Sequence, residues 1–559
     1  MSVVQQVLAP LFQPGSPYCL PSHPCFPPPS AFAALNSSLT GRLIVPEPTA
    51  CVAGEGAPSL CEDAEWRVQQ PGAVQFINFE TGWQSDNTTV PVDEDHSRHR
   101  LPSYVVQATH VDDVQRAVAF AAAHRLRLRI KNTGHDYLGR SSAHGSFTLW
   151  TTGLNSTAFH PAFVPEGAPT GYDDGEPALV VGSGVRVKQL YEAADQAGVI
   201  VPGGVSASVG AAGGFVLGGG HGPLAPLLGL AADHVLEFTV VTSNATIVKA
   251  SPFSNPSLFK ALRGGGPAFG VVTEVALRAH TPPKGFVGIF GTFKIKYGVE
   301  KSVADEAWKG LIQEWVALQP KVSDAGPFAG YTYVRRPLAV PFAYVLPSDD
   351  LDLAKSTFQS FITHADNDPS VELNISFAEE KTWHAMWAGQ FEAALFDLDE
   401  VGINLLLGGR LVPEDVVRHN TTDLADFLSQ SKTPAIVHLV AGGAVKNDPY
   451  YPSSVNPRWR TALLHIDLPV SWPRDSPPAS IHAMESYLTQ HTLALGKIAS
   501  AGGIPEGAYS SEANYHEKEW QGTWYGEENY QSLLEAKREW DPQGVFSGRK
   551  VVGSEFVGH

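Results

Sequence analysis

Residues 203–238 read GGVSASVGAAGGFVLGGGHGPLAPLLGLAADHVLEF. This segment gives the strongest indication of the fold that we expect for this chain. Its glycine-dense stretch, 210–222, leads into two strand-like runs at 234–244 and 245–251, which predict a hairpin joined near Asn244. Glycine lets the backbone approach a ligand closely or adopt a positive φ, and free backbone N–H groups can bind anions. The segment therefore predicts backbone that surrounds a ligand at the end of a sheet.

Three further glycine-containing segments lie at predicted strand or helix ends. They are residues 134–139, 203–204 and 264–270. One such loop would mean little, but four in one region predict a large planar cofactor that carries phosphate. The common nucleotide fingerprints fit poorly, because GSGVRV (182–187) is not a complete G-x-G-x-x-G and no G-x-x-x-x-G-K-S/T occurs. The sequence thus disfavours a Rossmann or P-loop site.

Upstream of this region the chain predicts a β-α-β unit. A short strand at Tyr104–Gln107 precedes a helix that Thr109 or Asp112 could cap and whose apolar residues recur at helical spacing. A second strand, LRLRI (126–130), leads into the polar loop KNTGHDYLGRSS (131–142). The pattern then resumes with a strand at 178–184, a helix at 187–198 and a strand at 199–204.

Downstream of about residue 285 the strand-like runs become longer. They include GFVGIFGTFKIKY (285–297), AIVHLVAGG (435–443) and TALLHIDLPVSW (461–472), with a helix at 304–318. A last helix, 529–540, ends at Asp541–Pro542 and could return to the first domain. We therefore expect an α+β chain with an irregular N-terminal extension at 1–95, a first domain at 96–285, a second at 286–500 and a C-terminal return at 501–559.

Charge and hydropathy disfavour two classes of partner. The 559 residues carry a formal net charge of -18 without any Lys/Arg-rich block, so attraction to nucleic acid or anionic lipid is not expected. No run of about 18 consecutive apolar residues occurs, as a membrane-spanning helix would need. We expect no nucleic acid and no membrane as partner, and a monomer.

The cysteines and sequons indicate an oxidising secretory route. An even number of cysteines in a Pro-rich, core-poor segment favours two disulfides over reactive thiols or a metal site, with three pairings open. These cysteines are Cys19, Cys25, Cys51 and Cys61. Six glycosylation sequons agree with secretion and begin at Asn36, Asn87, Asn155, Asn244, Asn374 and Asn420. The start, MSVVQQVLAPLFQPG, lacks the regions of a signal peptide, so we expect secretion with the signal peptide absent from this numbering.

Four ordered motifs resemble the FAD-linked oxidases of the vanillyl-alcohol-oxidase/p-cresol-methylhydroxylase type, in their berberine-bridge-like branch. Residues 131–142 resemble the R-x-x-G-H-x-x-x-G-x-S loop that carries a flavin-linked histidine, and 203–238 resembles the second flavin-binding stretch. LFKALRGGGPAFGVVTEV (258–275) and the run at 512–546 are the other two matches, with a less specific one at 456–472. The resemblance implies a two-domain α+β fold, in which N- and C-terminal parts form the flavin domain around an inserted α+β substrate domain.

The resemblance also implies FAD with a single covalent link through His135. A neutral imidazole nitrogen can add to the electrophilic 8α carbon of the flavin ring, and the tether raises the redox potential. Many relatives add a second bond from a cysteine, but Ser206 stands at the matching position, and a hydroxyl is far less nucleophilic than a thiolate. The expected cofactor-binding residues are Lys131, Asn132, Thr133, Gly134, His135, Gly139, Ser141, Ser142, Gly204, Ser206, Val209, Gly210, Gly213, Gly214, Gly220, His221, Gly222, Val272, Asn514 and Tyr515.

Oxidation of an alcohol needs a base for the hydroxyl proton. His465 and Asp467 share one face of a predicted strand by period two and form a candidate base pair, with a solvent-facing pair as the alternative. Tyr137 corresponds to a family aromatic that faces substrate, with a structural loop tyrosine as the alternative. Arg410 is a weaker candidate. We expect no metal ligands.

The run TGRLIVPEPTAC (40–51) resembles the fungal isoamyl-alcohol-oxidase-like subgroup. It implies a secreted oxidase that converts a small alcohol to a carbonyl and reduces O2 to hydrogen peroxide. The family pattern Y-x-N-E reads Tyr509-Ser510-Ser511-Glu512 here, which puts the family's substrate preference in question. The alternatives are a carbohydrate or secondary-metabolite oxidase of the same fold, a dehydrogenase, and a flavin-binding glycoprotein without turnover.

Overall fold

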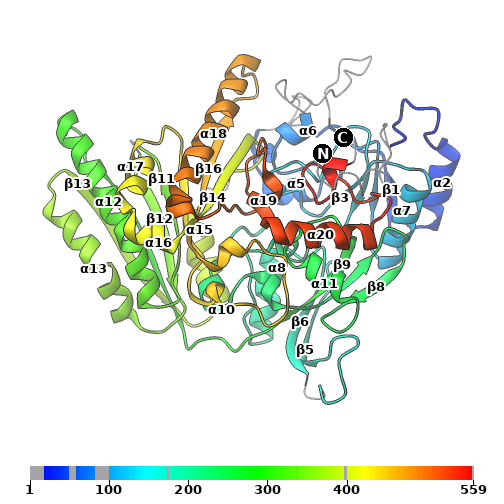
Figure 1. The fold of residues 1–559 in the computed structure, drawn as a ribbon, viewed down its shortest axis with the longest axis horizontal. Helices are drawn as coiled ribbons and strands as arrows, with labels where there is room; N and C mark the ends of the chain where they lie inside the picture. The colour runs from blue at the N-terminus through cyan, green and yellow to red at the C-terminus, as the bar shows by residue number, and fades with distance from the viewer. Residues whose placement is uncertain are drawn as a thin grey trace.

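The computed structural model describes residues 18–49, 58–81, 100–172, 175–336, 338–395 and 400–556. Two smaller sheets with their helices occupy one half of the molecule, and a large sheet with its helices occupies the other (Figure 1). Among the described residues, none of the helices combines the length and apolar character needed to span a bilayer. The helices and strands are mixed throughout, as expected for an α+β chain.

The first sheet has four strands in the order β1-β2-β4-β3. The strands are β1 (Arg42–Ile44), β2 (Tyr104–Gln107), β3 (Leu128–Lys131) and β4 (Phe147–Trp150). The strands β2, β4 and β3 are parallel, because α7 (Val111–Ala123) carries the chain back between β2 and β3. The helix buries Val114, Ala117, Val118 and Ala121 against this sheet, which is the face that its spacing predicts.

The N-terminus of α7 differs from the prediction. The N-cap residue is His110, whose Nδ1 accepts a hydrogen bond from the backbone of Asp112 (3.3 Å), so neither Thr109 nor Asp112 is the cap. The carboxylate of Asp113 accepts from the backbone N–H groups of Thr109 and His110. Asp113 in the first turn of α7 thus forms a capping box with His110 and satisfies several helix-end donors at once.

The N-terminal extension is not the irregular appendage that we expected. It forms α2 (Pro29–Ser38), α4 (Pro58–Cys61), α5 (Ala64–Val68) and α6 (Asn78–Thr81), and its strand β1 pairs antiparallel with β2. Asp113 also accepts hydrogen bonds from the backbone of Thr40 (2.7 Å) and Gly41 (3.1 Å). The extension is therefore an edge of the first sheet, and pairing with a distant strand overrides its Pro-rich composition.

The predicted disulfides fall partly within the described residues. Cys19 and Cys25 form a disulfide with a Cα–Cα distance of 5.6 Å. Cys61 is also disulfide-bonded, whereas Cys51 lies outside the described residues. The described cysteines are therefore all oxidised, as the sequence predicts.

The second sheet is antiparallel, with five strands in the order β5-β6-β9-β7-β8. The strands are β5 (Thr157–Phe163), β6 (Glu176–Gly182), β7 (Val235–Val241), β8 (Ile247–Ala250) and β9 (Val271–Arg278). The β7–β8 hairpin confirms the one predicted from residues 234–251. Its helical elements are α8 (Val187–Gln196), η1 (Ala211–Phe215), α9 (Val216–Gly218), α10 (Ala225–Leu228), η2 (Ala231–His234) and α11 (Pro256–Leu262).

The strand predicted at 199–204 is wrong. Only an isolated bridge between Ile200 and His280 forms there. Pro202 has no N–H to donate to a ladder, and the segment that follows turns along a cavity wall instead.

The third sheet has seven strands in the order β13-β10-β12-β11-β15-β16-β14, and every pair is antiparallel. The strands are β10 (Phe286–Ile295), β11 (Ala329–Val334), β12 (Val340–Leu346), β13 (Val371–Glu380), β14 (Asn404–Pro413), β15 (Ala435–Leu439) and β16 (Ala462–Trp472). The long helices α12 (Lys301–Ala325), α13 (Leu351–Asn367), α17 (Thr421–Gln430) and α18 (Pro478–Ala499) accompany this sheet (Figure 1). Its shorter helices are α14 (Trp383–Met386), η3 (Trp387–Phe391), α15 (Glu392–Leu395), α16 (Glu414–His419), η5 (Gly443–Lys446) and η6 (Pro457–Arg460).

The C-terminal segment passes back to the first half of the molecule. After η7 (Ala501–Gly503) come α19 (Trp520–Tyr525), α20 (Glu527–Trp540) and η8 (Ser554–Phe556). Helix α20 packs against α11, and the Nζ of Lys537 donates to the carbonyls of Ala268 (2.7 Å) and Phe546 (2.8 Å). Residues from both ends of the chain therefore build one half of the molecule, which lies beside the inserted sheet (Figure 1).

Candidate active site

A cavity of about 1790 Å³ lies between the two halves of the molecule. One wall comes from residues 128–141, 204–221, 266–272 and 546–551, and the other from β11, β14, β15 and β16. Ligand pockets commonly enclose roughly 300–1,000 Å³. This cavity therefore has room for a large cofactor and a second molecule beside it.

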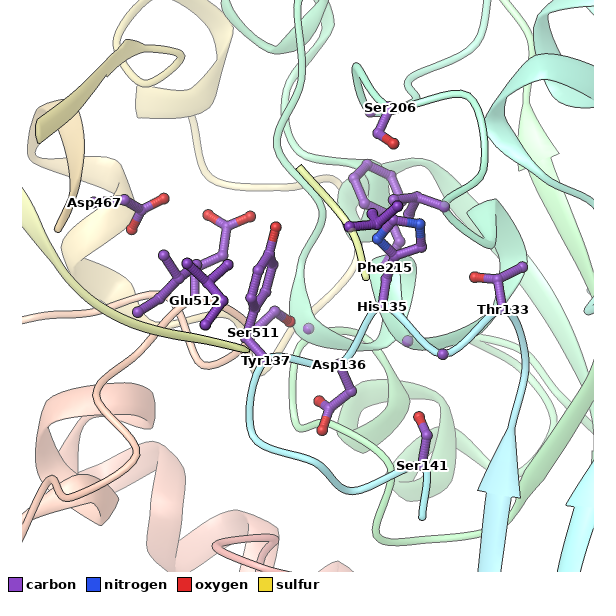
Figure 2. Close-up of a pocket in the computed structure, with 18 of the residues that line it drawn as sticks. Thr133, His135, Asp136, Tyr137, Ser141, Ser206, Phe215, Asp467, Ser511 and Glu512 are labelled. Carbon is purple, nitrogen blue, oxygen red and sulfur yellow. The ribbon is translucent and has the colours of Figure 1, made fainter. Parts of the chain in front are cut away.

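His135 enters the cavity from the loop that follows β3. Its Nε2 lies 2.7 Å from Oγ of Ser208, and the imidazole points toward the loop that carries Ser206 (Figure 2). Gly134 precedes the histidine with φ = 85°, and a Cβ there would lie 2.9 Å from Cα of Val74. Because that contact is with backbone, only glycine lets the chain pass and turn His135 inward.

The histidine loop is interlocked with the glycine-dense segment. A Cβ on Gly210 or Gly213 would lie 2.6 Å from Nδ2 of Asn132, and the N–H of Gly210 donates to Oγ1 of Thr133 (3.2 Å). Gly214 differs, because a Cβ there would have no atom within 4 Å although the residue lines the cavity. The lack of a side chain at Gly210 and Gly213 therefore leaves room for Asn132 of the histidine loop. At Gly214 it leaves the cavity wall without a protruding side chain.

The described part of the protein leaves one buried polar side-chain atom unpaired on each of three residues of the cavity wall. Asn132 Oδ1, Ser183 Oγ and Ser547 Oγ have no hydrogen-bond partner among the described residues. Buried polar groups in native proteins are nearly always hydrogen-bonded. Their positions along the wall fit a long cofactor that is polar over much of its length.

Most of the predicted site residues line this cavity. They are Asn132, Thr133, Gly134, His135, Tyr137, Ser141, Gly204, Ser206, Val209, Gly210, Gly213, Gly214, His221, Val272 and Asp467. Tyr137 stacks on Phe76 with ring centroids 4.5 Å apart, so one face of its ring packs against protein. Figure 2 shows His135, Tyr137 and Glu512 around the same cavity.

Other predicted cofactor residues lie behind the cavity wall. The Nζ of Lys131 donates to the carbonyl of Gln70, and burial lowers the pKa of this lysine to about 7. Ser142 Oγ donates to the carbonyl of Phe79 (2.6 Å). Residues that support the wall without lining it are Lys131, Gly139, Ser142, Gly220, Gly222, Asn514 and Tyr515.

Arg410 is not at the site, contrary to its prediction as a weaker catalytic candidate. It is fully buried on β14, does not line the cavity, and donates to Glu506 (2.9 Å) and Glu517 (2.8 Å). These two carboxylates explain why the guanidinium of Arg410 can be buried, because an unpaired charge there would be strongly destabilising.

A second group of side chains, which we call the acid–base cluster, contains His221, His438, His465, Asp467 and Glu512. Oε2 of Glu512 lies 3.0 Å from Nε2 of His221 and 2.8 Å from Nε2 of His465. His465 Nε2 lies 3.2 Å from Oδ1 of Asp467, and His438 Nε2 lies 3.6 Å from Oδ2 of the same carboxyl. The predicted His465–Asp467 pair is therefore brought together, and it is buried rather than solvent-facing.

Burial and charge set the protonation of the acid–base cluster. Burial raises the pKa of Asp467 to about 7, and Glu512 adds to this effect. Although burial opposes the charged imidazolium, Asp467 and Glu512 raise the pKa of His465 to about 10. Burial opposes ionisation of Glu512 too, but His221 and His465 hold the pKa of this carboxyl well below its usual range. Burial and the neighbouring imidazoles lower the pKa of His438.

Sequence reasoning did not single out His438, Ser208 or Glu512 as site residues. His438 stands directly opposite His465 in the β15–β16 register, which no local pattern reveals. Ser208 and Glu512 lie within matched motifs, but their side chains meet His135 and His465 only in the folded chain. A histidine in an apolar strand-like run was the one available signal for His438.

Comparison with known proteins identifies the family. A family model described as "FAD binding domain" matches residues 102–251, and "Berberine and berberine like" matches 508–552. An uncharacterized FAD-linked oxidoreductase of Arthroderma benhamiae is 36% identical, over 96% of this chain and 94% of the relative. The VAO-type flavoprotein oxidase VAO615 of Thermothelomyces thermophilus is 31% identical, over 97% of this chain and 94% of the relative. The chain belongs to the FAD-linked oxidoreductases of the vanillyl-alcohol-oxidase type.

Solved structures of this family have the same two-domain fold. The VAO-type flavoprotein MtVAO615 from Myceliophthora thermophila C1 has a TM-score of 0.80 at 28% identity, covering 96% of this chain and 97% of that one. MtVAO713 from the same organism has a TM-score of 0.83 at 24% identity, with the same coverage. A glucooligosaccharide oxidase from Acremonium strictum shares the fold at 18% identity, with a TM-score of 0.63 over 81% of this chain and 92% of that one.

The residues of this FAD-linked oxidoreductase fit its cofactor. The interlocked loops, the unpartnered polar atoms and the open face at Gly214 belong to one wall of the cavity. FAD would be held there by residues that include Asn132, His135, Ser183, Gly214 and Ser547. A bound FAD supplies a two-electron acceptor, which no side chain of the protein can provide.

Proposed function

We propose that this FAD-linked oxidoreductase is a secreted, covalently flavinylated oxidase that converts an alcohol to a carbonyl while O2 is reduced to hydrogen peroxide. One observation carries the proposal. A single cavity has His135 on the wall that fits the flavin and, on the other wall, the buried carboxyl of Asp467 with its pKa raised to about 7. A general base works best when its pKa lies near the operating pH.

The proposed tether is one bond, from His135. The hydroxyl of Ser208 lies 2.7 Å from Nε2 of this histidine and can orient the imidazole for bond formation. The glucooligosaccharide oxidase from Acremonium strictum has a 6-S-cysteinyl, 8α-N1-histidyl FAD. This chain has Ser206 on the facing loop and no cysteine after Cys61, so we propose no second bond.

We assign the hydroxyl proton of the substrate to Asp467. This carboxyl lines the cavity from β16, and His465 lies 3.2 Å behind it, outside the cavity lining. The wall that carries this carboxyl combines polar side chains such as Tyr333, Lys432 and Ser471 with apolar residues, which include Leu405, Leu407, Ile436, Pro469, Val470 and Met484. The apolar part of this wall favours an alcohol with a hydrocarbon body.

The size of the cavity supports a second candidate substrate class. About 1790 Å³ exceeds what FAD and a very small alcohol need, judged by the usual size of ligand pockets. Oxidation of a bulkier secondary metabolite is therefore the alternative within the same chemistry.

Secretion is supported by oxidised cysteines and exposed sequons. Cys19 and Cys25 form a disulfide, which is rare in reducing compartments. Four sequon asparagines are exposed, namely Asn36, Asn155, Asn244 and Asn374. Protein recovered from the medium of the native host should shift to lower mass with an endoglycosidase, and recovery only from the cell interior would contradict secretion.

The tether is tested by denaturation. Acid-precipitated protein should stay yellow and yield one flavin-labelled peptide that contains His135. His135→Ala should give a colourless pellet with free FAD in the supernatant, whereas Ser206→Ala should remain yellow. Free FAD from the unsubstituted protein would disprove the covalent link, and a yellow His135→Ala pellet would place it elsewhere.

The reaction is tested by anaerobic bleaching of the flavin absorbance with a series of alcohols. An oxidase should bleach with a substrate and recover rapidly in air, with hydrogen peroxide formed in proportion to carbonyl. Slow recovery in air would identify a dehydrogenase. Absence of bleaching across aliphatic, aromatic and carbohydrate alcohols would favour a flavin-binding glycoprotein without turnover.

A further inference from the structure

The acid–base cluster links the two halves of the molecule through buried contacts. Asp467 and His465 come from β16, whereas His221 follows α9 and Glu512 lies in the C-terminal return. The contacts run from Asp467 to His465 (3.2 Å), from His465 to Glu512 (2.8 Å) and from Glu512 to His221 (3.0 Å). Its two ends, Asp467 and His221, both line the cavity, while the connecting His465 is fully buried.

The acid–base cluster has room for an extra proton. Both ring nitrogens of His438 and the Nδ1 atoms of His221 and His465 have no hydrogen-bond partner among the described residues. These imidazoles are at least nine-tenths buried. Because Nε2 of His438 has no hydrogen bond within the described chain and lies 3.6 Å from Oδ2 of Asp467, a proton added to this carboxyl faces a free imidazole nitrogen away from bulk water.

Charge favours the protonated state of the cluster. With Asp467 and Glu512 ionised and His465 charged, these three groups carry one net negative charge. One added proton on Asp467 makes the sum zero, which is the cheaper state in a buried site. The aromatic groups that face the cluster are Tyr331, Trp459 and Tyr509, and burial raises the pKa of both tyrosines, so they stay neutral.

The proposed reaction releases a proton in its first half and takes up a proton in its second half. Oxidation of an alcohol to a carbonyl removes two electrons and two protons, one of which leaves from the hydroxyl group. Reduction of O2 to hydrogen peroxide takes up two electrons and two protons, so the complete cycle balances without net exchange of protons with water. The hydroxyl proton is therefore released in the first half of the cycle and required again in the second.

We propose that the acid–base cluster retains the hydroxyl proton between the two halves of the cycle and returns it when O2 is reduced. This inference rests on the proposed oxidase function. Asp467 receives the proton from the substrate. Glu512 and His438 are positioning residues: Glu512 contacts the charged His465 at 2.8 Å and adds the negative charge that the retained proton offsets, and His438 approaches the second oxygen of Asp467 at 3.6 Å.

The experiment counts protons during anaerobic reduction by an alcohol, with a pH indicator in weakly buffered solution. The unsubstituted holoenzyme should release almost no proton as the flavin bleaches. Glu512→Gln makes the resting cluster neutral, so an added proton would leave a buried positive charge, and about one proton per carbonyl should appear in solution. Glu512→Asp keeps the charge and should retain the proton, as should the surface control His419→Gln, whose side chain is 73% exposed.

Three results would overturn the inference while leaving the oxidase proposal intact. The first is release of about one proton per carbonyl by the unsubstituted enzyme, and the second is stoichiometric transition metal in the purified protein, held by the same imidazoles and carboxylates. A reading independent of turnover is the ¹⁵N NMR signal of histidine: His465 should carry protons on both ring nitrogens at pH 8, and should still do so in Glu512→Gln, where Asp467 remains beside it. The third overturning result is a neutral His465 in the unsubstituted protein. Failure of every alcohol to bleach the flavin would instead overturn the oxidase proposal.

Discussion

At the scale of single residues, Asp467 shows how the fold changes the chemistry of a common side chain. An exposed aspartate has a pKa near 3.9 and is a weak base at neutral pH. Burial on β16 raises the pKa of Asp467 to about 7, with Glu512 as a second cause. The same carboxyl therefore becomes a base of useful strength because of where the strand places it.

Asp467→Asn should lower kcat by a factor of roughly 10²–10⁴, the usual contribution of a positioned base. In the unsubstituted enzyme kcat/KM should rise with pH through about 7, because the ionised carboxylate is the active form. The asparagine variant should lack this rise. The pH dependence of kcat/KM between pH 5 and pH 9 checks the prediction.

Asp324→Asn is the matched control, since this carboxylate is 60% exposed on the surface. Its profile should overlay that of the unsubstituted enzyme. An Asp467→Asn variant that kept the full rate and the same pH dependence would assign the base to another residue.

At the scale of elements, the glycine-dense segment has two kinds of glycine that substitution should separate. A Cβ on Gly222 would lie 1.9 Å from the carbonyl oxygen of Gly203, so Gly222→Ala should prevent the two segments from packing and yield little folded protein. A Cβ on Gly214 would meet no protein atom, but would protrude into the flavin wall of the cavity. Gly214→Ala should therefore fold normally and bind less flavin.

Soluble yield, melting temperature and the ratio of flavin to protein absorbance together check this pair of variants. Equal flavin content in Gly214→Ala and the unsubstituted protein would show that the cofactor does not lie against this wall. A well-folded Gly222→Ala would show that the two segments can separate without cost.

A pair of histidines between η2 and the end of β9 should make the fold sensitive to acid. His280 Nε2 lies 2.8 Å from His234 Nδ1, and His234 Nε2 donates to the carbonyl of Leu228 (2.8 Å). Burial lowers the pKa of His234 to about 3 and that of His280 to about 4. Between pH 6.5 and about 4 the unfolded chain binds protons that the folded chain does not, so stability falls as pH falls through this window.

The melting temperature should therefore decrease from pH 7 to pH 4.5, and His280→Gln should reduce that decrease. The exposed His160→Gln should leave the decrease unchanged. An identical pH dependence in His280→Gln and the unsubstituted protein would show that other groups control the acid response.

At the scale of the whole molecule, ion pairs of Arg410 connect the inserted domain to the C-terminal return. It lies on β14, while its partners Glu506 and Glu517 belong to the segment that closes the flavin half. Removing one member of a buried charged group commonly costs about 3–5 kcal/mol, because the others are left unpaired. Arg410→Ala should destabilise the protein by an amount of that order.

Chemical denaturation of Arg410→Ala, followed by flavin fluorescence and by tryptophan fluorescence, checks this prediction. The half-exposed Arg418→Ala should change stability much less, because water and salt already screen its pairs with Glu414 and Asp324. If the two variants had equal midpoints, the buried network would not hold the domains together.

Features that depend on local geometry could be predicted from the amino-acid sequence alone. Glycine at 134 and through 210–222 is needed wherever backbone packs closely, and a histidine after such a glycine must project from a tight loop. The period of two along β16 placed His465 and Asp467 on one face before any contact was known. Hydrophobic spacing likewise predicted α7, the β7–β8 hairpin and the strands β10, β15 and β16 of the third sheet, because these signals lie within a few residues.

Contacts between segments that lie far apart in sequence could be found only in the folded chain. His438 reaches Asp467 through the register of β15 on β16, and Glu512 reaches His465 because the C-terminal return docks beside the inserted sheet. The N-terminal extension became part of the first sheet through a partner strand more than fifty residues away in sequence. Strand register and the docking of the C-terminal return are set by the packing of whole faces, which local spacing does not reveal. The pKa shifts follow from the burial that this packing produces, so they cannot be obtained from local spacing either.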